Sequence, residues 1–207
     1  MSSFSNDKTA LTKGEQTQQA LIQSAYKLFL QKGYHGTSMR QIAKGANLAL
    51  GGIYNHFASK EEIFRAVVLA HHPFLKIFPK FEEATEDSSM SPKEMIRNLT
   101  HLIFSEFKKE PQLLNLMFIE LVELEGDNLA ALFPQVQPRI FIFLQKISAQ
   151  QPNWRIPNPI IFLRSYIGFI IGFYITDRFM PKAFGPSDAA GDLDDYLEIF
   201  FHGLFKD

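Results

Sequence analysis

The segment Thr37–Lys60 contains two short helical patterns separated only by a tight turn, and this feature constrains the fold most. Thr37 or Ser38 is expected to begin the first helix, since either hydroxyl can accept a hydrogen bond from the first turn. Gly45-Ala46-Asn47 predicts the turn, and a second helix is expected over about 49–57. Two short helices joined in this way predict a helix-turn-helix over 38–57, whose second helix enters the major groove of DNA.

Helical periodicity divides the second helix into an inner and an outer face. Ile53 and Phe57 share the inner face with Ala49. The outer and flanking positions hold small, amide or hydrogen-bonding aromatic residues: Gly51, Gly52, Asn55, Tyr54 and His56. Each glycine costs a helix roughly 1 kcal/mol relative to alanine, so the pair calls for a reason. Close approach of the backbone to another surface supplies one, and a loop in place of a helix is the alternative.

The rest of the chain also follows helical patterns. Apolar residues recur at spacings of three and four before Lys32, and Ser59 and Ser91-Pro92 are typical helix starts. Further helices are expected over about 92–109, 111–125, 133–150, 159–179 and 192–205. Polar and apolar residues nowhere alternate for long, although runs such as Ile140–Leu144 leave a local choice between helix and strand. The expected fold is all-α, with a three-helix N-terminal domain and a larger helical domain after it.

Charge and phenylalanine are distributed unevenly along the chain. Residues 1–70 hold 8 Lys and Arg against 4 Asp and Glu, whereas residues 71–207 hold 13 against 18. Of the 21 phenylalanines, 17 follow residue 70. We therefore expect a flexible arm over 1–13, a basic domain over 14–72 that faces a polyanion, and an acidic, aromatic domain over 73–207 that faces something apolar. A chance distribution of surface charges is the alternative.

Several classes of protein are disfavoured by what the sequence omits. Without cysteine there is no disulfide framework or thiolate metal site, and common phosphate-binding and hydrolase motifs are missing. The adjacent His71 and His72 do not share a helix face, so no metal site is expected there. Residues 1–20 lack the apolar core of a signal peptide, and Arg164 and Asp177 leave only twelve uncharged residues in the most apolar stretch. We expect a cytoplasmic protein that is not an enzyme and needs no cofactor, metal or membrane.

The segment Lys13–Val68 resembles the DNA-binding domain of the TetR (tetracycline-repressor) family of transcriptional regulators. The resemblance rests on the patterns G-Y-x-x-T-S-x-R-x-I-A and A-x-L-x-x-G-x-I-Y-x-H-F-x-S-K-E. It implies DNA contacts from residues in and beside the motif: Thr37, Ser38, Arg40, Tyr54, His56 and Lys60, with Leu50, Gly51, Gly52 and Asn55 facing the groove. It places in the core Leu28, Ala43, Ala46, Ile53 and Phe57. The family often has Ser or Thr where this chain has Ala49.

Some of these assignments have alternatives. Tyr54 and His56 are compatible with half-buried packing, and Lys60 with pairing to a neighbouring glutamate. Leu50 lies at the border of the buried stripe, so it could either pack in the core or face the DNA groove. The outer face offers few base-reading side chains, so we expect specificity to come from DNA shape and two side chains, Arg40 and Asn55.

The resemblance also implies a homodimer with a small-molecule site in its C-terminal domain. The helices over 159–179 and 192–205 are expected to form the dimer interface, where Gly168 and Gly172 permit close helix approach; a monomeric core helix is the alternative. The pocket candidates are aromatic residues and one acid: Phe104, Phe107, Phe118, Phe141, Phe143, Phe162, Phe169, Phe173 and Glu120. Core packing is the alternative for each ring, and solvent exposure for Glu120 and its neighbour Glu123.

The resulting hypothesis is a transcription regulator, expected to be a repressor, that binds a pseudo-palindromic operator as a homodimer. A small hydrophobic or aromatic effector would release it by favouring the conformation that does not bind DNA. Control by a protein partner in place of a small molecule is the alternative. A ligand-binding or enzymatic protein that has lost DNA binding is a third possibility.

Overall fold

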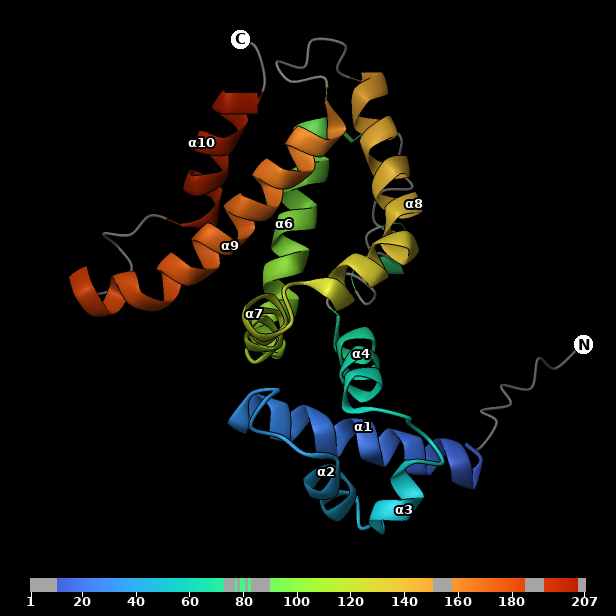
Figure 1. Ribbon diagram of the computed structural model, residues 1–207. Coiled ribbons are helices and arrows are strands. Elements are labelled where there is room, and N and C mark those ends of the chain that lie inside the picture. The colour runs from blue at the N-terminus through green and yellow to red at the C-terminus, as the bar shows by residue number, and fades with distance from the viewer. Residues whose placement is uncertain are drawn as a thin grey trace, which may run out of the picture. The chain divides into compact units, whose positions relative to one another are not determined.

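The computed structural model describes residues 11–72, 77, 79–80, 82, 90–150, 158–184 and 192–204 (Figure 1). All regular structure within these ranges is helical, which confirms the all-α prediction. The helices are α1 (Lys13–Lys32), α2 (Met39–Gly45), α3 (Leu50–Ile53), α4 (Lys60–His71), α6 (Pro92–Lys109), α7 (Leu113–Glu123), α8 (Asp127–Gln150), α9 (Pro159–Phe184) and α10 (Leu193–Leu204). The arm expected over 1–13 lies outside the described residues as far as residue 10, and Lys13 already belongs to α1.

The chain divides into two compact units. The first, here called the head unit, comprises residues 1–73 and 109–133, so it joins α1–α4 with α7 and the start of α8. The second, the body unit, comprises residues 74–108 and 134–207. The division of the sequence into domains at residue 72 stays a prediction. The charge pattern of the sequence gave no sign that the later segment 109–133 packs with the first helices.

The head unit is built on α1, which packs against α2, α4 and α7. The inner face of α1 is a run of fully buried side chains: Leu21, Ala25 and Phe29. The Phe29 ring meets Phe64 of α4 edge to face, with centroids 5.0 Å apart. At Gly45 of α2 a Cβ would lie 2.3 Å from Ser24 Oγ, and that hydroxyl donates to the Ile42 carbonyl at 2.9 Å. A glycine therefore permits the first motif helix to approach α1 this closely.

The helix starts expected from serine are present. Ser38 caps α2, Ser59 caps α4, and the Ser91 hydroxyl accepts from the Glu94 N–H at the start of α6. At α2 the cap is reciprocal, because the Gln41 side chain accepts from the Ser38 N–H at 2.9 Å. These are local signals, in which the residues that make the bond lie within one turn of each other.

Two helices differ from the expected bounds for identifiable reasons. Regular helix in α3 covers only Leu50–Ile53, and the N–H groups of Asn55 and His56 bond three residues back, in a turn. α8 begins at Asp127 rather than near 133, so it contains Pro134 and Pro138. Its first N–H groups bond to a carboxylate of α7, a contact that local sequence patterns do not reveal.

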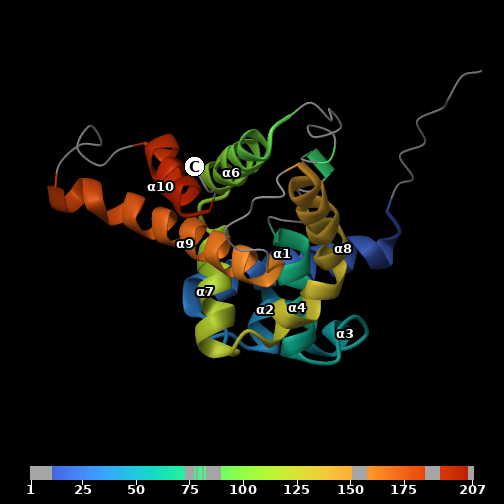
Figure 2. The same cartoon turned by 90° about the horizontal axis from the view of Figure 1, so that it is seen from above.

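In the body unit α6, α9 and α10 pack through buried aromatic rings and a few polar bonds. Figure 1 and Figure 2 both show α10 alongside α9. The Thr100 hydroxyl of α6 and the Tyr166 hydroxyl of α9 lie 2.8 Å apart, both buried. Arg97 of α6 pairs with Asp194 and Glu198 of α10, in the latter case at 2.6 Å.

By length and composition alone, Pro159–Arg178 of α9 is apolar enough to cross a membrane, a test that the core helix of a soluble protein also passes. The expectation that this helix is buried on several sides is met only in part, since 22% of this segment is buried in the single chain. Four isoleucines along it are exposed: Ile160, Ile161, Ile167 and Ile175. A monomeric core helix does not account for this exposure.

Candidate DNA-binding surface

The start of α2 presents one of the two hydroxyls expected to meet DNA. Thr37 is buried, and its Oγ1 donates inward to the Gly33 carbonyl at 2.9 Å. Ser38 is exposed and caps the helix, so its side chain and the first turn's N–H groups lie together at the surface. Helix N-termini of this kind favour phosphate oxygens. The geometry thus supports Ser38 as a phosphate contact more directly than Thr37.

The segment of α3 and its following turn separates inner from outer residues as periodicity predicts. Ile53 and Phe57 are buried. Leu50 is 44% exposed, so it does not belong to the core. Tyr54 is 53% exposed, so it is not a half-buried packing residue. The other outer residues range from exposed to half-buried: Gly51, Gly52, Asn55 and His56. Ala49 holds the N-cap position without a side-chain bond, as its residue type requires.

The two glycines of α3 have different surroundings. A Cβ built on Gly51 meets nothing within 4 Å. A Cβ on Gly52 would lie 3.0 Å from Leu48 Cγ, closer than ordinary van der Waals contact. Internal packing therefore gives a reason for Gly52, whereas packing within the described residues gives none for Gly51.

Lys60 is engaged within the head unit. Its ammonium group donates to the carbonyls of Tyr34 and Thr37 at 2.7 and 2.9 Å and lies 4.1 Å from the centre of the Tyr34 ring. Burial lowers the pKa of this amine. The expected alternative, pairing with a neighbouring glutamate, is not found: Glu61 pairs with Arg65 instead. Two of the three N–H donors of the Lys60 ammonium group thus bind backbone carbonyls, and a contact with a phosphate would use the third.

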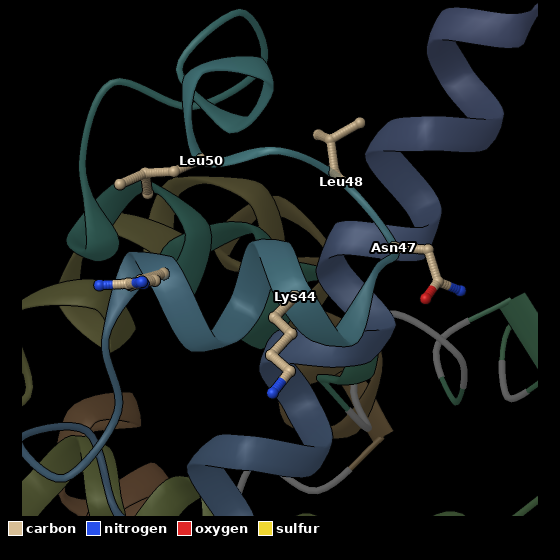
Figure 3. Close-up of a pocket in the computed structure, with 5 residues that line it drawn as sticks. Lys44, Asn47, Leu48 and Leu50 are labelled. Atoms are coloured by element: carbon tan, nitrogen blue, oxygen red, sulfur yellow. The ribbon is translucent and has the colours of Figure 1, made fainter.

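Two other cationic side chains of the motif, Arg40 and Lys44, make no hydrogen bond or ion pair within the part of the chain that the structure describes. The segment 16–60 contains no Asp or Glu. Both side chains belong to α2 and are exposed. They line an open hollow with Asn47, Leu48 and Leu50 (Figure 3). Sequence reasoning selected Arg40 and Leu50 but passed over the other three residues of this hollow.

Residues 21–67 match the family model described as "Bacterial regulatory proteins, tetR family", and this range includes α2, α3 and most of α1 and α4. This segment of the chain is thus similar to the DNA-binding domain of the TetR family. Three similar TetR-family relatives carry regulator or repressor names. UidR of Escherichia coli K12 is 29% identical over 46% of this chain and 48% of its own length. KstR2 of Mycobacterium tuberculosis is 33% identical over 38% of each chain. DhaR of a Mycobacterium species is 29% identical over 50% and 51%.

The matched part spans about half or less of these relatives' length. Solved structures extend the likeness of fold beyond that part. The hemolysin II regulator HlyIIR has a TM-score of 0.61 at 16% identity and covers 94% of this chain and 100% of its own. The TetR-family regulator PfmR of Thermus thermophilus has a TM-score of 0.57 at 22% identity and covers 74% and 84%. At these identities the likeness supports the fold, a helix-turn-helix domain followed by a helical domain.

Three polar side chains of α7 and α8 form hydrogen bonds within the head unit: Glu120, Glu123 and Asn128. The sequence did not predict this role for any of the three. The Glu123 carboxylate accepts from the His35 N–H at 2.8 Å, in the loop that precedes α2. Glu120 is fully buried and accepts from the N–H groups of Asn128 and Leu129. The Asn128 amide in turn accepts from Arg65 of α4 at 3.2 Å.

Glu120 was expected either in the effector pocket or in solvent. Its two oxygens are bound by the start of α8, including the Asn128 side chain at 3.0 Å. This explains its burial as a structural carboxylate. Phe118 shares α7 with it, so both belong to the head unit, whereas the other pocket candidates belong to the body unit.

The remaining pocket candidates belong to the body unit, and most of them are packed together. Phe104, Phe107, Phe143, Phe162 and Phe169 are buried, Phe173 is half-buried and Phe141 is 38% exposed. Phe104 meets Phe173 edge to face at 5.1 Å, and Tyr196 of α10 lies 5.3 Å from Phe173. The rings of α6 and α9 thus pack with one another and with those of α10, as both a core and an effector-site wall would, whereas Phe141 and Phe143 belong to α8.

Proposed function

We propose that this chain is a homodimeric transcription regulator, of the repressor type, that binds a pseudo-palindromic operator through its head unit. A small hydrophobic or aromatic effector held by the body unit would shift it to a conformation that does not bind DNA. The TetR-family relatives are regulators and repressors by name, which supports the general class.

One observation carries the DNA-binding part. Four residues in and beside α2 and α3 are exposed and carry groups that suit DNA: Ser38, Arg40, Tyr54 and Asn55. Ser38 also caps α2, whereas the other three side chains make no hydrogen bond or ion pair within the described residues. They belong to the acid-free segment 16–60, so no carboxylate on it repels phosphate. Arg40 suits a guanine edge or a phosphate, and Asn55 suits adenine.

Exposed apolar side chains support the dimer. Besides the four isoleucines of α9, Ile199 of α10 is 72% exposed. Gly168 of α9 is exposed and a Cβ there would meet nothing within 4 Å. A Cβ at Gly172 would lie 3.4 Å from the Tyr196 hydroxyl oxygen, an ordinary van der Waals contact. An apolar, small-residue surface on two adjacent helices fits a second copy of the same helices. The proposed interface therefore covers 159–179 and 192–205.

The proposed effector is apolar because the body unit offers rings and few free polar groups near them. The two hydroxyls of Thr100 and Tyr166 bond to each other, and burial raises the pKa of Tyr166 well above its usual value. A ligand among these rings gains affinity mainly from burial and ring contacts.

Selection from random duplex DNA tests the proposal, followed by rebinding of the selected sequences across a salt series. The expected result is an inverted repeat whose two halves lie about one helical turn apart, bound with affinity that falls steeply as salt increases. Replacement of Arg40, Tyr54 or Asn55 by alanine is expected to weaken binding or relax sequence preference, with the helical circular dichroism unchanged. Absence of any enriched sequence for folded protein contradicts the proposal.

A further inference from the structure

A hollow of about 480 Å³ lies between the exposed face of α2 and the start of α3. Arg40 and Lys44 line it from α2, Asn47 and Leu48 from the turn, and Leu50 from the first residue of α3. Figure 3 shows the Lys44 and Asn47 side chains projecting from the α2 end, with Leu48 and Leu50 beside the connection to α3. The hollow thus borders the surface proposed to enter the groove, and it has a polar and an apolar side.

The polar side carries an unbalanced positive charge. Arg40 and Lys44 are four residues apart, so they occupy one face of α2. No acidic residue lines the hollow. Lys60 contrasts with them, because two backbone carbonyls already bind its ammonium group. The hollow therefore offers an incoming anion two cationic side chains that make no bond within the described residues.

Asn47 adds a neutral donor to this pair. Its backbone φ is +56°, in the left-handed region that asparagine tolerates better than most residues. Its N–H bonds to the Lys44 carbonyl at 3.1 Å, which ties the turn to the last turn of α2. Its side-chain amide is exposed and unbonded among the described residues. The turn therefore adds an exposed amide donor to the lining of the hollow.

We propose that this hollow binds a backbone phosphate of duplex DNA, with Lys44 and Arg40 supplying charge and Asn47 an amide N–H. The inference rests on the proposed function and adds three residues, Lys44, Asn47 and Leu48, to its DNA-contacting set. Leu48 and Leu50 form the apolar side, against which a deoxyribose packs while the phosphate faces the cations. A contact of this kind positions the protein on DNA without reading sequence.

Two substitutions separate the contributions of charge and amide. Lys44→Gln removes one phosphate contact per subunit, hence two per dimer. The slope of log affinity against log salt is then expected to flatten by about 1.8, with a loss of about 30-fold at 0.15 M salt, equally on operator and unrelated DNA. Asn47→Gly keeps the left-handed turn and removes the amide. It is expected to lower affinity without changing the slope, because no charge is lost.

Lys108→Gln is the matched control, since it removes the same charge from an exposed lysine of α6 in the body unit. Its slope is expected to equal that of the unchanged protein. Urea midpoints of all three variants establish that each is folded. A Lys44→Gln slope equal to that of the control overturns the phosphate site while the proposed function stands. If the unchanged protein binds neither DNA, both the site and the proposed function are overturned.

Discussion

Replacement of Gly51 by alanine tests whether the recognition segment approaches DNA with its backbone. The methyl group meets nothing within 4 Å, and Gly51 lies within α3, where alanine is the better helix former. Alanine also restricts the unfolded chain, so we expect Gly51→Ala to stabilise the protein by about 0.4–1 kcal/mol. If the glycine is present for close approach, the same variant binds operator at least about tenfold more weakly, a cost of roughly 1.4 kcal/mol.

Gly52→Ala is the matched control. Its methyl group would lie 3.0 Å from Leu48 Cγ and 3.2 and 3.4 Å from the two Cδ atoms, so Leu48 has to shift. Overpacking of this kind costs about 1–3 kcal/mol, which offsets or exceeds the gain in helix propensity. We therefore expect Gly52→Ala to be less stable than Gly51→Ala by at least about 1 kcal/mol, the lower end of that range.

Urea denaturation followed by circular dichroism measures stability, and titration of a selected operator measures affinity. Two results refute the reasoning. If Gly51→Ala is destabilised with an unchanged urea dependence, the space around residue 51 is not open. If it binds operator as the unchanged protein does, close backbone approach is not the reason for this glycine.

Three further predictions concern stability and assembly. Glu120→Gln removes the negative charge bound by the Asn128 and Leu129 N–H groups, so we expect a loss of about 1.5–3 kcal/mol in urea denaturation; unchanged stability contradicts a structural role. Burial lowers the pKa of His72 to about 4 from 6.5, so the unfolded chain binds the proton first as pH falls. Stability is therefore expected to decrease between pH 6.5 and 4, by about 2 kcal/mol at pH 5, and His72→Gln removes this dependence if the assignment is correct. Ile199→Asp is expected to shift sedimentation from dimer to monomer, whereas Val122→Asp, 79% exposed on α7, does not; equal behaviour of the two argues against an interface on α10.

The sequence predicted best what depends on neighbours within one helical turn. Ser38 and Ser59 cap their helices because the acceptor hydroxyl and the donor N–H are fixed by adjacent residues. The inner face of α3, with Ile53 and Phe57, also follows from periodicity alone. Charge and motif spacing then located the candidate surface within residues 38–60.

Features set by contacts distant in the sequence were missed or left open. The start of α8 depends on Glu120, eight residues earlier and on another helix. Lys60 donates to carbonyls 23 and 26 residues before it. A sequence motif specifies only that this residue is a lysine, so it does not reveal these hydrogen bonds. Gly52 likewise lies against the Leu48 side chain, and sequence periodicity alone does not predict this contact.

The loop between α1 and α2 connects these observations. From one helix, α4, Lys60 holds the carbonyls of Tyr34 and Thr37; from another, α7, Glu123 holds the His35 N–H. The residue after this loop is Ser38, the cap of the first motif helix. The loop that leads into that helix is thus held by side chains from both α4 and α7. We therefore expect a displacement of α7 to reach the helix-turn-helix through this loop, and the residues to examine for such coupling are Glu123 and Lys60 rather than the exposed face.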